Sequence, residues 1–218
     1  LIDEYDKPLL QNLHDEEMQN RFRNMLKPFY GVLKTMDRAI RFALLTGVTK
    51  FGKVSVFSDL NNLDDISMRE PYAAICGITE TELRTHFDED IHTLASALER
   101  TYEEARSLLR KRYDGYHFVA GGPGIYNPFS LLNTFKYMRL SDYWFETGTP
   151  TYLVELLKRT NYDLYDMANT ETDADVLNSI DSASNNPIPV IYQSGYLTIK
   201  DYEPEFKIYR LGFPNQEV

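Results

Sequence analysis

The sequence predicts an α-rich α/β fold, and three observations support this prediction. A short apolar segment, Leu1–Ile2, ends in the acidic pair Asp3-Glu4, as a buried strand does where it leaves a sheet. Apolar residues recur at helical spacing through much of the chain that follows. Near its end, two apolar segments flank a turn at residues 203–205, which is the pattern of a β-hairpin. A length of 218 residues allows one large domain or two small ones.

The first half of the chain is expected to alternate helices and strands. A long helical stretch follows Pro8, and Pro28 inside it predicts a kink or a division into two helices. Residues 40–45 (IRFALL) are predicted to form a buried strand that runs into Thr46-Gly47. A further strand is predicted at residues 72–76, ending at Gly77.

Helix-start signals dominate the rest of the chain. Thr79 and Glu82 have the spacing of a capping box, and the helices that follow are expected to end near Tyr113. The Asn127-Pro128 and Thr149-Pro150 pairs predict helices at about 128–138 and 150–159, because each offers a cap and a first helical residue. A short helix is expected near residues 174–180, before the terminal hairpin.

Composition narrows the possible functions. The net charge of −10 does not attract phosphate backbones, so nucleic acid is a possible partner that the charge does not support. The single cysteine, Cys76, excludes an intramolecular disulfide framework and a cysteine-based zinc site, and we expect it to be buried. No apolar run reaches membrane-spanning length and no signal peptide is visible, so we expect a cytoplasmic protein without a membrane partner.

The acidic pair Asp3-Glu4 has the chemistry of a Walker B strand. An aspartate at the carboxyl end of a strand can hold Mg²⁺ through its water shell, and an adjacent glutamate can polarise the attacking water. Hydrophobic-Asp-Glu also occurs by chance, so the motif is a hypothesis. Thr46 and Thr49, near the end of the next predicted strand, are candidates for the polar residue that senses the terminal phosphate. The alternative is an ordinary Thr-Gly strand exit.

A second segment resembles a phosphate-binding loop in the spacing of its residues. Residues 47–53 (GVTKFGK) have the glycine and lysine spacing of such a loop. However, Val54 stands where a hydroxyl should bind magnesium, and the stretch after it is poor in helix formers. We interpret the match as accidental.

Several stretches together resemble the predicted AAA-ATPase-like family of bacterial proteins. They are LIDEYDKPL, LLTGVTKFGKVSVFSDLNNLDDIS, AAICGITETEL, YDGYHF, YNPFSLLN, YWFETGTPTYLV, YQSGYLTIKDY and YRLGFPNQEV. The resemblance implies that Asp3 and Glu4 are the Walker B pair, with Asp3 holding magnesium through water, and that Thr46 or Thr49 is the sensor. It implies that the phosphate loop, or Walker A part, lies upstream of Leu1, and that a PD-(D/E)XK nuclease-like domain often lies downstream.

On this resemblance we expect a truncated P-loop core at residues 1–78, a helical lid at 79–125 and a winged-helix-like module at 126–218. We expect the chain to be a fragment of a longer protein, since it begins at Leu1 inside a predicted strand and stops without a helix cap or a polar tail. ATP and Mg²⁺ would act in the full-length parent. We expect neither of them, nor any other metal, to bind the fragment alone, which should not hydrolyse ATP. The alternative function is a non-enzymatic interaction or DNA-docking module that positions a nuclease domain.

A basic cluster marks the end of the helix near Tyr113. Its members are Arg106, Arg110, Lys111 and Arg112. Positive charge near a helix carboxyl end is favourable without any ligand. The functional alternative is a second sensor arginine that reaches a nucleotide from the lid.

Overall fold

The computed structural model describes residues 1–51, 56–57, 60, 62–148, 150–178, 180 and 186–218. The chain forms two compact units whose segments alternate along the sequence. Unit 1 comprises residues 1–65, 150–164 and 172–194, and unit 2 comprises residues 66–149, 165–171 and 195–218. Helices with small antiparallel sheets give the mixed α/β composition that the sequence predicts. The P-loop core, the winged-helix module and the three-part domain division stay predictions.

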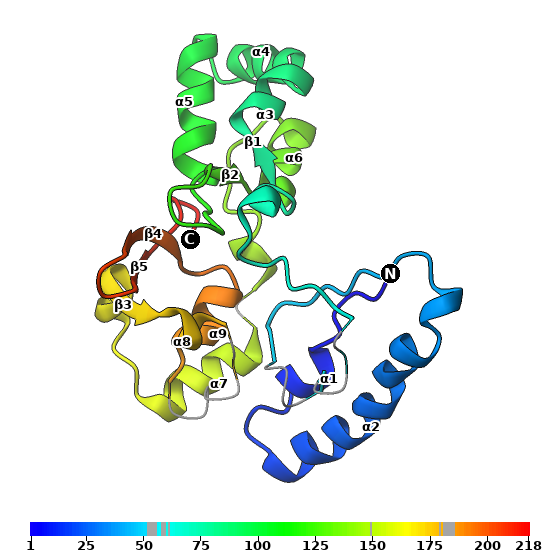
Figure 1. Ribbon diagram of the computed structural model, residues 1–218. Coiled ribbons are helices and arrows are strands. Elements are labelled where there is room, and N and C mark those ends of the chain that lie inside the picture. The colour runs from blue at the N-terminus through cyan, green and yellow to red at the C-terminus, as the bar shows by residue number, and fades with distance from the viewer. Residues whose placement is uncertain (52–55, 58–59, 61, 149, 179, 181–185) are drawn as a thin grey trace. The chain divides into compact units, whose positions relative to one another are not determined.

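Unit 1 is built mainly from helices (Figure 1). They are α1 (Lys7–Leu10), α2 (Glu16–Thr35), the 3-10 helix η1 (Asp37–Ala39), α7 (Thr151–Thr160), α8 (Ala174–Leu177) and α9 (Ile188–Gln193). Asp15 caps α2, because its side chain accepts a hydrogen bond from the Met18 amide at 2.8 Å. Of the two outcomes predicted for Pro28, the division into two helices is wrong: α2 continues through Pro28 as one helix.

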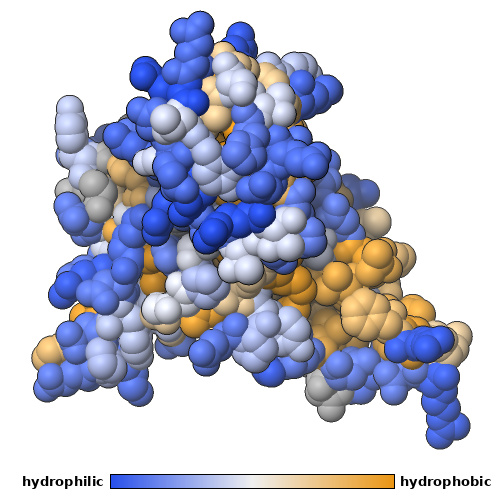
Figure 2. Space-filling view, turned by 90° about the horizontal axis from the view of Figure 1, so that it is seen from above, coloured by the Kyte–Doolittle hydropathy of each residue, from blue (hydrophilic) through white to orange (hydrophobic). Residues whose placement is uncertain are grey.

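One face of α2 remains apolar and exposed. Met25, Phe29, Val32 and Met36 are each more than half exposed. Figure 2 shows hydrophobic surface at the right of its view, the side on which Figure 1 draws α2. The apolar stripe of this helix therefore does not pack into the core of unit 1.

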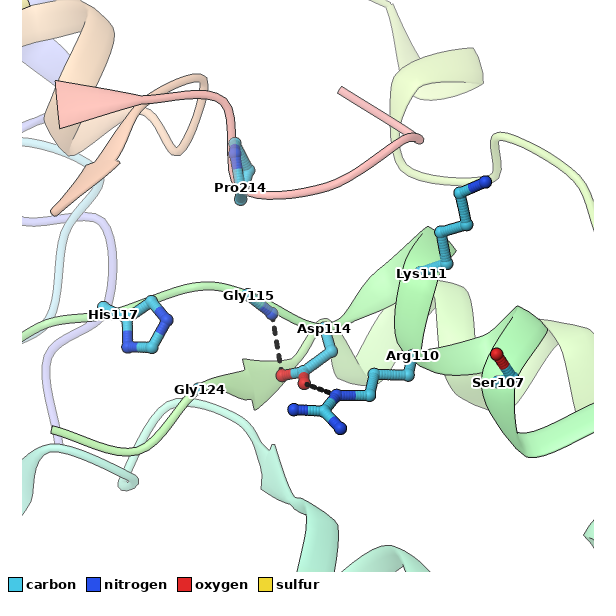
Figure 3. A pocket seen from close by; sticks show the side chains of 8 residues that line it. All are labelled: Ser107, Arg110, Lys111, Asp114, Gly115, His117, Gly124 and Pro214. Carbon is cyan, nitrogen blue, oxygen red and sulfur yellow. Dashed lines mark hydrogen bonds and ion pairs between the residues drawn. The ribbon is translucent and has the colours of Figure 1, made fainter. Parts of the chain in front are cut away.

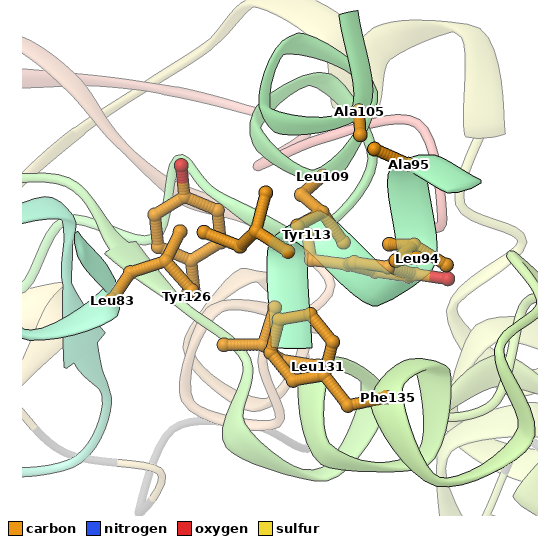
Figure 4. Packing of buried hydrophobic residues seen from close by; sticks show 10 residues of the cluster. Leu83, Leu94, Ala95, Ala105, Leu109, Tyr113, Tyr126, Leu131 and Phe135 are labelled. Atoms are coloured by element: carbon orange, nitrogen blue, oxygen red, sulfur yellow. The ribbon is translucent and has the colours of Figure 1, made fainter. Parts of the chain in front are cut away.

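Unit 2 contains a closed helical core. Its elements before the tail are η2 (Glu70–Tyr72), β1 (Ile78–Thr79), α3 (Glu80–His86), α4 (Asp88–Ala97), α5 (Tyr102–Tyr113), β2 (Ile125–Tyr126), α6 (Pro128–Tyr137) and η3 (Phe145–Thr147). Ten buried residues from these elements pack together (Figure 4). They include Leu83, Leu94, Leu109 and Leu131, and the Tyr113 hydroxyl donates a hydrogen bond to the Ser141 carbonyl at 2.8 Å.

The predicted helix starts in unit 2 are confirmed. Thr79 and Glu82 form both hydrogen bonds of a capping box at α3. Asn127 caps α6 through the Phe129 and Ser130 amides, with Pro128 as the first helical residue. In unit 1, α7 confirms a helix in the predicted place, but it begins at Thr151 with Pro150 at the cap position and not as the first helical residue; Thr149 lies outside the described residues.

The chain ends in the predicted hairpin. Strands β4 (Thr198–Glu203) and β5 (Ile208–Gly212) pair antiparallel. A third strand, β3 (Thr170–Asp173), follows the 3-10 helix η4 (Leu164–Asn169) and gives the sheet order β3-β5-β4.

Three further sequence expectations are wrong. Residues 40–45 do not form a buried strand: only Leu45 makes a strand-like bridge, and Phe42 is 73% exposed. Residues 72–76 form the end of η2 and a turn, and the strand in this region, β1, begins later, at Ile78. Cys76 is exposed, because it lies in that turn and not in a packed strand.

Candidate functional site

A short parallel pairing in unit 1 positions the predicted site residues. Ile2 forms a parallel bridge with Leu45. The Ile2 amide donates to the Leu44 carbonyl at 2.9 Å, and the Thr46 amide donates to the Ile2 carbonyl at 2.8 Å. Parallel strands bring their carboxyl ends to the same edge. Asp3 and Thr46, which follow the paired residues, are therefore neighbours.

The Asp3 carboxylate and the Thr46 hydroxyl are in direct contact. The Thr46 hydroxyl donates to Asp3 Oδ1 at 2.5 Å, and the Glu4 amide donates to the same oxygen at 2.9 Å. These two hydrogen bonds, the Thr46 bond first, lower the pKa of Asp3. Asp3 therefore presents an ionised, exposed carboxylate whose second oxygen, Oδ2, receives no hydrogen bond from the described residues.

Glu4 lies beside this carboxylate in an unusual backbone conformation. Its φ of 51° is in the left-handed region, which non-glycine residues seldom adopt. Its carboxylate forms an ion pair with Lys7 at 2.7 Å, and both side chains are more than half exposed. Such a pair is weak, so it leaves the Glu4 carboxylate available to other partners.

The second threonine has a different environment. Thr49 is buried, and both its amide and its hydroxyl donate to Asp6 Oδ2, at 2.5 and 2.6 Å. Asp6 is fully buried and also accepts from the Val48 amide at 3.2 Å. Gly47 permits this approach, because an added Cβ would overlap the Asp6 carboxylate. Of the two sensor candidates, only Thr46 is exposed beside Asp3.

Asp6 is a site residue that the sequence reasoning missed. Its position just before α1 and Pro8 is a signal for a helix cap, yet its side chain makes no capping hydrogen bond. It binds instead to amides more than 40 residues away. No local pattern in the sequence indicates that partner.

A pocket of about 410 Å³ in unit 1 opens next to this site. Its lining comes from the site segment, α1 and the start of α7, and comprises Glu4, Asp6, Lys7, Leu10, Gln11, His14, Val48, Pro150, Thr151, Tyr152 and Glu155. Across it, His14 Nδ1 lies 3.8 Å from a Glu155 carboxylate oxygen. The Glu4 carboxylate therefore faces a space that can hold water or part of a ligand.

The GVTKFGK segment is only partly described. Its Lys50 is already bound within unit 1: the amide donates to Gln193 Oε1 at 2.5 Å, and the ammonium group contacts Asp65 and Asn178. Residues 52–55, with the second glycine and Lys53, lie outside the described residues. The interpretation of this segment as an accidental match stays a prediction.

The basic cluster of α5 separates into two pairs. Arg106 binds Glu80 and Glu103 at 2.8 and 2.7 Å, and Arg112 binds Asp142 at 2.6 Å. These two guanidinium groups therefore have structural partners within unit 2. Arg110 and Lys111 line a different pocket of the same unit.

Comparisons with known proteins agree with the resemblance in the sequence. Residues 1–57 match the model of a family described as "Predicted AAA-ATPase". A protein of Azotobacter chroococcum mcd 1, described as "Uncharacterized protein in vnfD 5'region", is 40% identical over 223 residues. That alignment covers 100% of this chain and 40% of the relative, so the chain spans less than half of the relative's length. No solved structure matches the chain.

Among the described residues, no helix is both long and apolar enough to cross a membrane.

Proposed function

We propose that this chain, whose residues 1–57 match the model of a family of predicted AAA-ATPases, carries the magnesium- and water-handling part of an ATP hydrolysis site. The observation that supports the proposal is the contact between Asp3 and Thr46 at the ends of two parallel segments. Nucleotide hydrolysis needs a metal-orienting acid and a phosphate-facing polar group close together. This juxtaposition joins residues 43 positions apart.

Magnesium fits this site through its water shell. In the described part of the chain, no three His, Cys, Asp or Glu residues gather to hold a metal ion directly. Asp3 nevertheless offers Oδ2 to a hydrated ion, because its two hydrogen-bond donors both use Oδ1. Mg²⁺ retains several waters and accepts one or two carboxylates, and when bound it would neutralise charge on the phosphates.

The neighbouring residues have separate roles in this proposal. Glu4 orients and polarises the attacking water, and its weak, exposed pair with Lys7 can give way to that water. Thr46 can exchange its hydrogen bond to Asp3 for one to a terminal phosphate oxygen. Thr49 and Asp6 hold the Thr46 segment in place, because their hydrogen bonds are buried.

Hydrolysis by the whole protein further requires groups that bind the phosphates, and we propose that a segment upstream of Leu1 supplies them. The proposed ATPase activity therefore belongs to the full-length parent. For the present chain alone, we expect no ATP hydrolysis, and any change of the melting temperature in millimolar ATP should be the same in Asp3→Asn as in the unchanged chain.

The test uses the full-length protein. Glu4→Gln should reduce ATP turnover by about 100-fold or more, because it removes a group that activates water. ATP binding, measured by equilibrium titration, should persist. Glu17→Gln on α2, an exposed glutamate outside the site, is the matched control and should keep full turnover. Unchanged turnover in Glu4→Gln would contradict the assignment.

The alternative, a DNA-docking hairpin, has less support. Arg210 on β5 pairs with Glu171 and Asp201, each at 3.3 Å. Lys200 donates to the Pro214 carbonyl at 3.2 Å. The three basic residues of the hairpin, Lys200, Lys207 and Arg210, are matched by three acidic ones, Asp201, Glu203 and Glu205, so the hairpin offers little net positive charge to a phosphate backbone.

A further inference from the structure

A second pocket lies wholly within unit 2, beside the last turns of α5 (Figure 3). We call it the α5 pocket. It has a volume of about 520 Å³, and α5 contributes Arg110 and Lys111 to its lining, with Asp114 immediately after the helix. His117, Gly124 and Pro214 line the rest. Small-molecule sites commonly have about 300–1,000 Å³, so a nucleotide-sized ligand is of suitable size.

The α5 pocket concentrates positive charge on an acidic chain. Arg110 lies 3.6 Å from the Asp114 carboxylate, but the Arg110 side chain is 71% exposed, so this pair is weak. Among the residues that the structure describes, no carboxylate pairs with the Lys111 ammonium group within 4 Å. The lining holds two cationic side chains and one carboxylate, Asp114, and therefore carries one net positive charge in a chain whose net charge is −10.

A fixed histidine offers an acceptor on the other side of the pocket. His117 Nδ1 lies 3.1 Å from the Gly122 carbonyl oxygen, which can only accept a hydrogen bond. Nδ1 therefore carries a hydrogen, and Nε2 of the neutral ring is an acceptor. The backbone of His117 is held on both sides by Thr198, whose hydroxyl accepts from the amide at 2.6 Å and donates to the carbonyl at 3.1 Å.

Glycine keeps the space between these groups open. A Cβ added at Gly124 would lie 3.0 Å from Asp114 Oδ1 and 3.5 Å from His117 Nε2. The absence of a side chain therefore leaves the Asp114 carboxylate and the His117 ring accessible to the same ligand. In Figure 3, Arg110 and Asp114 lie together near the centre, His117 lies across from them, and the Lys111 side chain extends away from Arg110 toward the upper right.

We propose that the α5 pocket binds a small phosphorylated molecule. Arg110 binds one phosphate group and Lys111, on another side of the lining, binds a second, since charge-assisted hydrogen bonds from these side chains are the strong ones. Asp114 and His117 accept hydrogen bonds from hydroxyl or amino groups on the rest of the ligand. The proposal uses residues of unit 2 alone, so it is independent of the Asp3–Thr46 site and of the ATPase assignment.

The test is a calorimetric titration of this chain with inorganic pyrophosphate in magnesium-free buffer that contains EDTA. We expect saturable binding, at least tenfold weaker in the Arg110→Ala/Lys111→Ala double variant. The control is Arg84→Ala/Lys136→Ala, which removes the same charge from exposed positions of unit 2 outside the pocket and should bind normally. Asp3→Asn should also bind normally, which separates this site from the proposed ATPase site.

A second variant tests the location without any change of charge. Gly124→Ala fills the gap between Asp114 and His117 and should weaken pyrophosphate binding severalfold, with helix content unchanged by circular dichroism. Three results would each overturn the proposal: no saturable binding at millimolar pyrophosphate, equal loss in the two double variants, or full binding by Gly124→Ala. Binding of a DNA duplex that depends on Arg110 and Lys111, without pyrophosphate binding, would also overturn it.

Discussion

Helices α2 and α5 both begin with a side-chain cap but differ in what they bury. The Asp15 side chain caps α2, and Thr101 and Glu104 form a capping box at α5. Only Gln19 and Tyr30 are buried among the 20 residues of α2. The 12-residue helix α5 buries Ala105, Leu109 and Tyr113 in a closed core. The difference shows that local signals define a helix, whereas its contribution to stability depends on what covers its apolar face.

The largest expected effect is on the core of α5. Leu109→Ala should destabilise unit 2 by about 2–5 kcal/mol, because Leu109 is fully buried and the change leaves a cavity. Phe29→Ala on α2 should change stability by no more than about 0.5 kcal/mol, because Phe29 is 64% exposed. Amide hydrogen exchange in α5 and in α2 would measure the two separately. A large loss for Phe29→Ala would show that α2 is covered in solution.

A smaller effect is expected at the two aspartates of the candidate site. Asp6→Ala should destabilise unit 1 by about 3 kcal/mol, because it leaves the buried Thr49 amide and hydroxyl without an acceptor. Asp3→Ala should leave stability nearly unchanged, because Asp3 is exposed. Denaturant unfolding followed by exchange of unit 1 amides would check both. Equal losses would contradict the division into a structural and a functional carboxylate.

Removal of the helix caps tests whether packing stabilises the first turn of α5 more than that of α2. Thr101→Ala and Asp15→Ala should each cost about 1 kcal/mol. In α5, packing should keep the first turn helical, so the rate of amide hydrogen exchange in that turn should rise only slightly. In α2, the first turn should fray, and its amides should exchange much faster. Equal fraying of the two helices, measured by hydrogen exchange, would mean that packing does not support α5 as described.

The smallest effect is a pH dependence near the end of the chain. Glu217 is buried and accepts hydrogen bonds from the Ser130 hydroxyl and the Trp144 amide, and burial raises its pKa. Its contribution to stability is therefore present below the ordinary pKa of glutamate and is lost as the pH rises through the folded-state pKa. Glu217→Gln cannot titrate. Its melting temperature relative to the native chain should rise between about pH 4 and pH 7, and a flat difference would refute this.

Signals confined to a few residues predicted structure well. The Thr79 capping box, the Asn127-Pro128 helix start and the hairpin of β4 and β5 all depend on neighbours within a few positions, and all are confirmed. At Pro28 the sequence allowed either a kink or a division into two helices, because the local cost of proline does not by itself decide whether the helix continues.

Partners distant in sequence limited the prediction. An apolar run such as residues 40–45 predicts a buried strand. Burial, however, requires other elements to pack against the run, and within it only Leu45 pairs with another strand segment. At the candidate site, the sequence indicated Asp3, Glu4, Thr46 and Thr49 but could not separate the two threonines. Their difference arises from Asp6, whose binding partners are set by the parallel pairing and not by any nearby motif.

The Asp6 carboxylate also bears on the order of folding. Its hydrogen bonds to Val48 and Thr49 close loops of 42 and 43 residues, and the Thr46–Asp3 bond closes another of 43. Long loops lose more entropy on closure than the short connections between α3, α4 and α5, and contacts distant in sequence form slowly. The helical core of unit 2 should therefore form early, and the candidate site should be among the last parts of the chain to gain protection during refolding.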